Sequence, residues 1–226
     1  MGKDMATTGY YNYTPMFVGV GGVNPKLNDI VPTSLDPQVT DLGGGQLLAF
    51  VLDTNRKFAK SFAYKTIDGD WVETEGWYFG DDETPTTYEL GPGESLQINT
   101  TYAVRFTHSG EVDQAQYEFS ALAGGYYMIG NQHATKMKLN DIAPTSLDPQ
   151  VTDLGGGQLL AFVLDTNRKF AKSFAYKTVD GDWADADGWY FGDEEVATTY
   201  ELEPGEVLQM NTTYAVKLTF PDQSIK

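Results

Sequence analysis

The sequence contains no cysteine, which excludes disulfides, thiolate nucleophiles and cysteine-ligated metals together. Basic residues are also scarce, since 15 Lys and Arg stand against 32 Asp and Glu and leave a formal net charge of −17. A surface this acidic repels phosphate groups, which proteins bind through clustered Lys and Arg. We therefore expect no binding to nucleic acid and no attraction to anionic membranes.

Long hydrophobic runs are missing too. No stretch approaches the roughly 18 apolar residues of a membrane-spanning helix, so membrane insertion is not expected. The opening residues Met1–Met5 lack the apolar segment of a secretory signal, and we interpret them as a start placed before a mature sequence. No segment carries the sustained apolar stripe of an amphipathic helix. The sequence is rich in aromatic residues (13%), in glycine (24) and in tyrosine (14). This balance is typical of β-structure with frequent turns.

A long internal repeat dominates the chain. Residues Lys26–Thr107 align without a gap to Lys138–Thr219, with about four positions in five identical and a period of about 112 residues. The run LDPQVTDLGGGQLLAFVLDTNRKFAKSFAYKT occurs twice, letter for letter. This period is longer than the roughly 20–50 residues of solenoid repeats. We therefore predict two tandem, near-identical domains, 1–111 and 112–226.

Alternating side chains indicate strands within each copy. Large residues alternate with small ones in the second half of Gln46–Thr66, and the segment predicts a β-hairpin. Asp68-Gly69 predicts another tight turn, whereas Asn28–Asp41, with two prolines, predicts a loop or a short helical turn. Each copy supplies about six or seven short strands at turn spacings of roughly 8–12 residues. The predicted fold class is all-β, with two antiparallel β-sandwich or barrel-like domains.

Several motifs form one series. An opening Met128-Ile129-Gly130-Asn131 is followed by Leu-Asn-Asp-Ile, an aromatic hairpin, and the turn Leu-x-Pro-Gly-Glu at Leu90–Glu94 and Leu202–Glu206. The strand after that turn ends in Phe-Thr-x-x-Gly-Glu-Val, from Phe106 to Val112. This series resembles repeat units of secreted or surface-attached bacterial β-proteins, a largely uncharacterised group. The resemblance implies a β-fold and an extracellular or cell-surface location, and it carries no catalytic residues.

Histidines and acidic residues are the first candidates for chemistry. The two histidines, His108 and His133, are not repeated between the copies, and we expect both to be surface residues. Asp68 and Asp70, with their twins Asp180 and Asp182, offer oxygen ligands for calcium. The full EF-hand spacing is missing, and an Asp-Gly turn explains the same letters. No catalytic residue and no cofactor are therefore expected, and these four acids are kept as a candidate calcium site.

Aromatic residues recur in both copies and suit a sugar-binding platform, because a ring face stacks on the apolar face of a pyranose. In Gly76–Gly80 the side chains alternate, so we predict buried Trp77 and Phe79 with an exposed Tyr78. Core packing is the competing interpretation, because aromatic residues dominate β-domain cores. The candidate glycan-binding residues are Trp71, Tyr78, Trp183 and Tyr190.

Three functions remain open on the sequence alone. The first is a non-enzymatic extracellular structural or assembly protein, such as a surface-layer, stalk or filament subunit. In this function, the stretch Thr7–Thr14, for which the sequence offers no pairing partner, adds a strand to a neighbouring subunit. The second is a tandem carbohydrate-binding module with avidity from two linked sites. The third, an acidic glycan hydrolase, requires two carboxylates that face one cleft.

Overall fold

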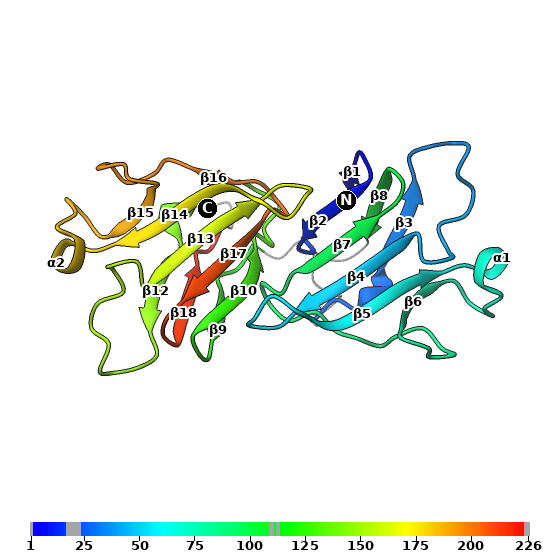
Figure 1. The fold of residues 1–226 in the computed structure, drawn as a ribbon, viewed down its shortest axis with the longest axis horizontal. Helices are drawn as coiled ribbons and strands as arrows, with labels where there is room; N and C mark the ends of the chain where they lie inside the picture. The colour runs from blue at the N-terminus through cyan, green and yellow to red at the C-terminus, as the bar shows by residue number, and fades with distance from the viewer. Residues whose placement is uncertain (1, 17–23, 109–110, 112–113, 224–226) are drawn as a thin grey trace.

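The computed structural model describes residues 2–16, 24–108, 111 and 114–223 and is drawn in Figure 1. Within these residues the chain forms antiparallel sheets, and helix is limited to one-turn elements. The predicted all-β fold class is confirmed. Val18–Val20 and Val112, which belong to the lead-in and the closing motif of the first copy, lie outside the described residues.

The described residues 2–16 and 24–108, here called the N-terminal half, form two sheets. One sheet has the strand order β1-β8-β3, and the other has the order β2-β7-β4-β5-β6. A 3-10 turn, η1 (Leu27–Asp29), precedes β3, and a one-turn helix, α1 (Ile67–Asp70), follows β5. The strand bounds are β1 Gly2–Met5, β2 Gly9–Tyr13, β3 Ile30–Ser34, β4 Leu47–Leu52, β5 Phe58–Lys65, β6 Gly76–Phe79, β7 Leu96–Thr100 and β8 Val104–His108.

Residues 114–223, the C-terminal half, repeat this strand order. The sheets run β12-β18-β9 and β10-β17-β13-β14-β15, with a two-stranded pair β11-β16 in addition. The bounds are β9 Tyr117–Ala121, β10 Gly125–Gly130, β11 Met137–Lys138, η2 Leu139–Asp141, β12 Ala143–Ser146, β13 Leu159–Leu164, β14 Phe170–Lys177, α2 Val179–Asp182, β15 Gly188–Phe191, β16 Glu201–Leu202, β17 Val207–Thr212 and β18 Val216–Phe220. The division into two domains at residues 111 and 112 stays a prediction.

The predicted hairpin is present as β4 and β5, which pair antiparallel. The turn between them is held by Asp53, whose carboxylate accepts hydrogen bonds from the backbone N–H groups of Asn55 and Lys57, each at 2.8 Å. Arg56 in this turn has a left-handed backbone with φ of 64°. Asp and Asn favour such turns because their side chains bond to the backbone nearby.

Each half has its own hydrophobic core between its two larger sheets. In the N-terminal half, Leu47 and Phe62 of the five-stranded sheet pack with Val104 and Phe106 of the three-stranded sheet, and all four are fully buried or nearly so. The C-terminal half repeats this arrangement with its own cluster. Side chains from two facing sheets that share one core define a sandwich-like arrangement.

One expectation about local structure was right only in part, and another was wrong. The segment Asn28–Asp41 begins in the helical turn η1 and ends in a loop, as predicted, but it also contains β3. This strand lies at the edge of its sheet, where Pro32 costs little pairing. The stretch Thr7–Thr14 is not unpaired, because it contains β2, which pairs with β7 in its own sheet. The side chain of Tyr13 at the end of β2 is fully buried. This strand is therefore part of the N-terminal core.

The two halves meet through reciprocal contacts. The turn after β4 presents Arg56 to aromatic rings of the C-terminal half, and its twin turn presents Arg168 to rings of the N-terminal half. The distances to the ring centroids are 5.4 Å for Arg56 to Tyr126, 5.2 Å for Arg56 to Phe170, 5.3 Å for Arg168 to Tyr10 and 5.4 Å for Arg168 to Phe58. Contacts exchanged in this way are the signature of a two-fold interface.

Backbone hydrogen bonds follow the same reciprocity. Tyr126 N–H donates to the Thr54 carbonyl at 2.8 Å, and Tyr10 N–H donates to the Thr166 carbonyl at 3.0 Å. Figure 1 shows the result, an elongated molecule with the halves side by side along its long axis and with α1 and α2 at opposite ends. The surfaces around α1 and α2 therefore point away from each other.

Candidate functional site

The candidate calcium ligands lie in and beside the one-turn helices. Thr66 caps α1, since its hydroxyl accepts from Gly69 N–H at 3.1 Å. The carboxylate of Asp70 accepts from the backbone N–H groups of Thr66 and Gly44, each at 3.0 Å. Asp180 and Asp182 occupy the same places around α2, where Asp182 accepts from Thr178 and Gly156. The expected tight turn at Asp68-Gly69 is a helical turn instead, because Thr66 is a good N-cap.

These acids are structural ties between two loops. The Thr66 hydroxyl also donates to Asp41 at 2.6 Å, and this bond holds the pKa of the Asp41 carboxyl below its usual range. Asp41 and Asp70 thus fasten the glycine-rich loop after Asp41 to α1. Within the described parts of the chain, no group of three or more His, Asp or Glu side chains is placed to hold a metal ion.

The two candidate tryptophans are almost fully exposed. Trp71 directly follows α1 with φ of 58°, and Trp183 follows α2 with φ of 57°. Each side chain is 91% exposed. A left-handed backbone is costly for a large residue, and an exposed tryptophan gains nothing from the core. The two most exposed aromatic side chains among the described residues therefore lie at equivalent places, directly after α1 and α2.

The tyrosine candidates are buried, which contradicts the expected exposure of Tyr78. Tyr78 is 0% exposed and Tyr190 is 1% exposed, whereas Phe79, expected in the core, is 44% exposed. Trp77 is buried as predicted. The Tyr78 hydroxyl donates to the Thr74 carbonyl at 2.6 Å, and the Lys65 ammonium lies 4.7 Å from the ring centroid. The loop after α1 thus covers the outer face of β6, which strand alternation alone does not predict.

A cleft of about 390 Å³ lies beside Trp183 in the C-terminal half. It places the exposed indole together with charged side chains, which are Lys177, Asp182, Asp185 and Glu195. Tyr190 contributes to its wall although its ring is buried. Of the four candidate glycan-binding residues, Trp71 and Trp183 are thus accessible, and the two tyrosines support the surface beneath.

Both histidines are buried, so the expectation of surface residues was wrong. His108 is 5% exposed, and its Nδ1 lies 2.9 Å from the Tyr13 hydroxyl. Burial lowers the pKa of His108 to about 4. His133 is 0% exposed, and its backbone N–H donates to the Asn131 side chain at 3.0 Å. Each ring packs against a tyrosine, His108 against Tyr13 and His133 against Tyr117.

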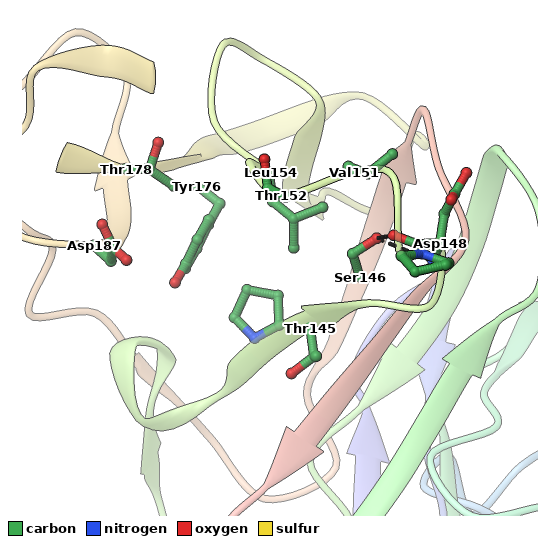
Figure 2. Close-up of a pocket in the computed structure, with 11 residues that line it drawn as sticks. Thr145, Ser146, Asp148, Val151, Thr152, Leu154, Tyr176, Thr178 and Asp187 are labelled. Carbon is green, nitrogen blue, oxygen red and sulfur yellow. Dashed lines mark hydrogen bonds between the residues drawn. The ribbon is translucent and has the colours of Figure 1, made fainter. Parts of the chain in front are cut away.

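A pair of equivalent cavities was missed by the sequence analysis. The cavity of the C-terminal half has a volume of about 340 Å³ and lies beside β12 and the loop that follows it (Figure 2). Its twin in the N-terminal half has a volume of about 270 Å³ and the same lining positions, shifted by 112 residues. In the C-terminal half, eight of the lining residues lie within 144–154, whereas Tyr176, Thr178 and Asp187 come from β14 and the segment before β15. Each residue looks ordinary in the sequence, and only the packing of these segments against each other forms the cavity.

The electrostatics of these cavities come from a tyrosine and two acids. Tyr176 and Asp187 lie side by side in Figure 2, whereas Asp148 lies at the opposite end of the cavity. Burial raises the pKa of Tyr176, and the negative charge of Asp187 adds to this effect. A glycan hydrolase requires two carboxylates that face one cleft, and in this cavity Asp148 and Asp187 lie at opposite ends. The cleft beside Trp183 is lined by Asp182, Asp185 and Glu195, so the hydrolase hypothesis stays untested.

Comparisons with known proteins place the chain in no group, since no family model, no curated protein and no solved structure matches it. Among the described residues, no helix is long and apolar enough to cross a membrane.

Proposed function

We propose that the chain is a non-enzymatic structural protein of the extracellular space or cell surface, in which two equivalent halves hold similar surfaces at opposite ends. The reciprocal contacts of Arg56 and Arg168 carry this proposal. They join the halves into one elongated body, as a spacer or array subunit requires (Figure 1). The repeated acids Asp41 and Asp70 support a non-enzymatic role, because their carboxylates already accept hydrogen bonds from the chain.

The route of assembly follows from charge and strand pairing. The segments around α1 and α2 are acidic, so contact between two such ends brings like charges together and is unfavourable. Addition of a strand is more compatible with edge strands such as β1 or β9, because β2 and β10 also contact the other half. We therefore propose lateral rather than end-to-end self-association.

Static light scattering over a range of concentrations, with negative-stain electron microscopy, tests this assembly. The intact chain is expected to form ordered oligomers as its concentration rises. The double variant Asp4→Lys/Glu118→Lys, which reverses a charge on each edge strand β1 and β9, is expected to lower the oligomeric state. A strictly monomeric intact chain at all concentrations contradicts the assembly role.

A second candidate function, a tandem carbohydrate-binding module, is favoured by the exposure of Trp71 and Trp183. Each is 91% exposed in a left-handed backbone, and they directly follow α1 and α2, which lie at opposite ends of the molecule (Figure 1). Two sites on one chain bind a polymer or a glycan-coated surface with avidity. Retention on a glycan array tests it, with Trp71→Ala/Trp183→Ala as the variant. If the intact chain retains no glycan, this second function fails.

A further inference from the structure

The twin cavities combine an apolar wall with polar side chains. In the N-terminal half, the wall comes from Pro32, Val39 and Leu42, and the polar groups come from hydroxyl and carboxyl side chains. The polar members are Thr33, Ser34, Asp36, Thr40, Tyr64, Thr66 and Glu75. Volumes of about 270 and 340 Å³ fall near the lower end of ligand pockets, roughly 300–1,000 Å³. The cavities therefore suit a small ligand.

Several of these polar groups are already occupied. The Ser34 hydroxyl donates to the Asp36 carbonyl at 2.9 Å, and one Asp36 carboxylate oxygen accepts from Gln38 N–H at 2.9 Å. The Thr66 hydroxyl donates to Asp41. These bonds shape the cavity wall and use part of its polar capacity, and in the twin cavity one oxygen of Asp187 accepts from Val179 N–H. The remaining lone pairs and hydroxyl groups decide what the cavity can bind.

Tyr64 and Glu75 are among the groups that remain. Tyr64 is 7% exposed and lines the cavity, and its twin Tyr176 is partly buried. Within the part of the chain that the structure describes, its hydroxyl forms no hydrogen bond with another residue. The hydroxyl oxygen itself is not fully buried, because it borders the cavity and is open to water. The Tyr64 hydroxyl can therefore donate to or accept from whatever enters the cavity.

The charge of the lining selects the ligand class. Each cavity contains two carboxyl residues, Asp36 with Glu75 or Asp148 with Asp187, and its lining includes no Lys or Arg. An anionic ligand would meet like charge without compensation. A neutral ligand with several hydroxyl groups can donate to a carboxylate and accept from a tyrosine hydroxyl, while its C–H face packs on proline and leucine.

The two copies of the repeat vary around this cavity but keep its carboxylate. Thr74 is replaced by Ala186, which removes a hydroxyl, whereas Glu75 is replaced by Asp187, which retains the acid. The shorter Asp187 lines the larger of the two cavities. The lining tyrosine is present in both copies, as Tyr64 and Tyr176.

We propose that each cavity is a binding site for a neutral, hydroxyl-rich ligand of the size of a sugar residue. The Tyr64 or Tyr176 hydroxyl hydrogen-bonds to the ligand, and Glu75 or Asp187 accepts from its hydroxyl groups. This proposal rests on the carbohydrate-binding function and gives that function two pockets per chain. The exposed Trp71 and Trp183 lie near the same ends and contact flanking parts of a longer glycan.

Isothermal titration calorimetry of the full chain tests the proposal. The probes are glucose, galactose, mannose and N-acetylglucosamine, with glucuronate as an anionic counterpart. The intact chain is expected to bind at least one neutral probe at two sites, and glucuronate at least tenfold more weakly. Tyr64→Phe is expected to reduce the stoichiometry to one, and Tyr64→Phe/Tyr176→Phe to abolish binding. Tyr102→Phe/Tyr214→Phe, outside both cavities, is the matched control, with circular dichroism as the check on folding.

Each alternative result would contradict a different claim: the cavity site, the charge selection or the carbohydrate-binding function. Unchanged binding in Tyr64→Phe/Tyr176→Phe, together with loss in Trp71→Ala/Trp183→Ala, overturns the cavity site and retains the carbohydrate-binding function. Equal affinity for glucuronate overturns the charge selection, and with it the proposed role of Glu75 and Asp187. Failure of the intact chain both to bind any probe and to retain any glycan on an array overturns the cavity site and the carbohydrate-binding function together.

Discussion

The guanidinium of Arg56 lies 5.2 Å from the centroid of the Phe170 ring, and Arg168 repeats this contact with Phe58 at 5.4 Å. Each arginine leaves a turn of one half and reaches an aromatic surface of the other half. An arginine over an aromatic face contributes about 0.5–1 kcal/mol at exposed sites and more when desolvated. The reciprocal pairs therefore stabilise the arrangement of the halves.

Removal of these guanidinium groups is predicted to weaken that arrangement. Arg56→Gln/Arg168→Gln keeps non-glycine residues in the left-handed turns and removes four ring contacts. We expect a loss of about 2–4 kcal/mol in the free energy of unfolding, measured in urea, and a broader distance distribution in small-angle scattering. Lys57→Gln/Lys169→Gln, in the same turns but exposed, is the control. Identical unfolding midpoints for the two double variants would contradict the role of the arginines.

The exposed tryptophans and buried tyrosines are predicted to respond in opposite ways. Trp71→Ala removes a side chain that is 91% exposed, and we expect a change within about 0.5 kcal/mol in the free energy of unfolding. Tyr78→Ala removes a fully buried ring and leaves a cavity, for which we expect a loss of about 3–5 kcal/mol. Thermal denaturation of the two variants distinguishes these outcomes. A destabilising Trp71→Ala would mean that this indole packs against the protein.

Strand periodicity explains which parts of the fold and of the candidate site could be predicted from the sequence. The hairpin from Gln46 to Thr66 follows from alternation and turn residues, which act over a few positions, and the structure contains it. The burial of Tyr78 does not follow, because it depends on the loop after α1 folding over β6. Likewise, Tyr64 and Glu75 are brought together by pairing between strands and loops. Local signals reach neighbouring residues only, whereas a site depends on contacts between distant ones.

His108 is predicted to make folding stability depend on pH between about 6.5 and 4. Burial lowers its pKa to about 4 in the folded chain, against about 6.5 in the unfolded chain. Below pH 6.5 His108 is therefore protonated in the unfolded chain but stays neutral in the folded chain. The free energy of unfolding falls as the pH falls, and it levels off below about pH 4. The full loss is on the order of 3 kcal/mol. Phe220 occupies the equivalent position in β18, so His108→Phe is expected to flatten this part of the profile in urea titrations. An unchanged slope in His108→Phe would assign it to other groups.

The acids around α1 are predicted to stabilise the chain without calcium. Asp70→Ala leaves the backbone N–H groups of Thr66 and Gly44 without their acceptor, and we expect a loss of about 1–3 kcal/mol in the free energy of unfolding. Asp68→Ala, at an exposed position in the same helix, is the control and should change little. Millimolar calcium is expected to leave the melting temperature of the intact chain unchanged. A rise with calcium that Asp70→Ala abolishes would restore the metal site.

The pairing of β2 makes a final prediction about strand addition. Because β2 (Gly9–Tyr13) already occupies the edge of β7, a labelled peptide of residues 7–14 is expected not to bind the intact chain. The same peptide should bind a chain lacking residues 1–14, because that deletion exposes the edge of β7 and the space that Tyr13 fills. Fluorescence anisotropy measures both cases, and a peptide with Tyr13→Ala controls for unspecific binding. Stoichiometric binding to the intact chain would show that β2 exchanges, in which case Thr7–Thr14 would serve assembly after all.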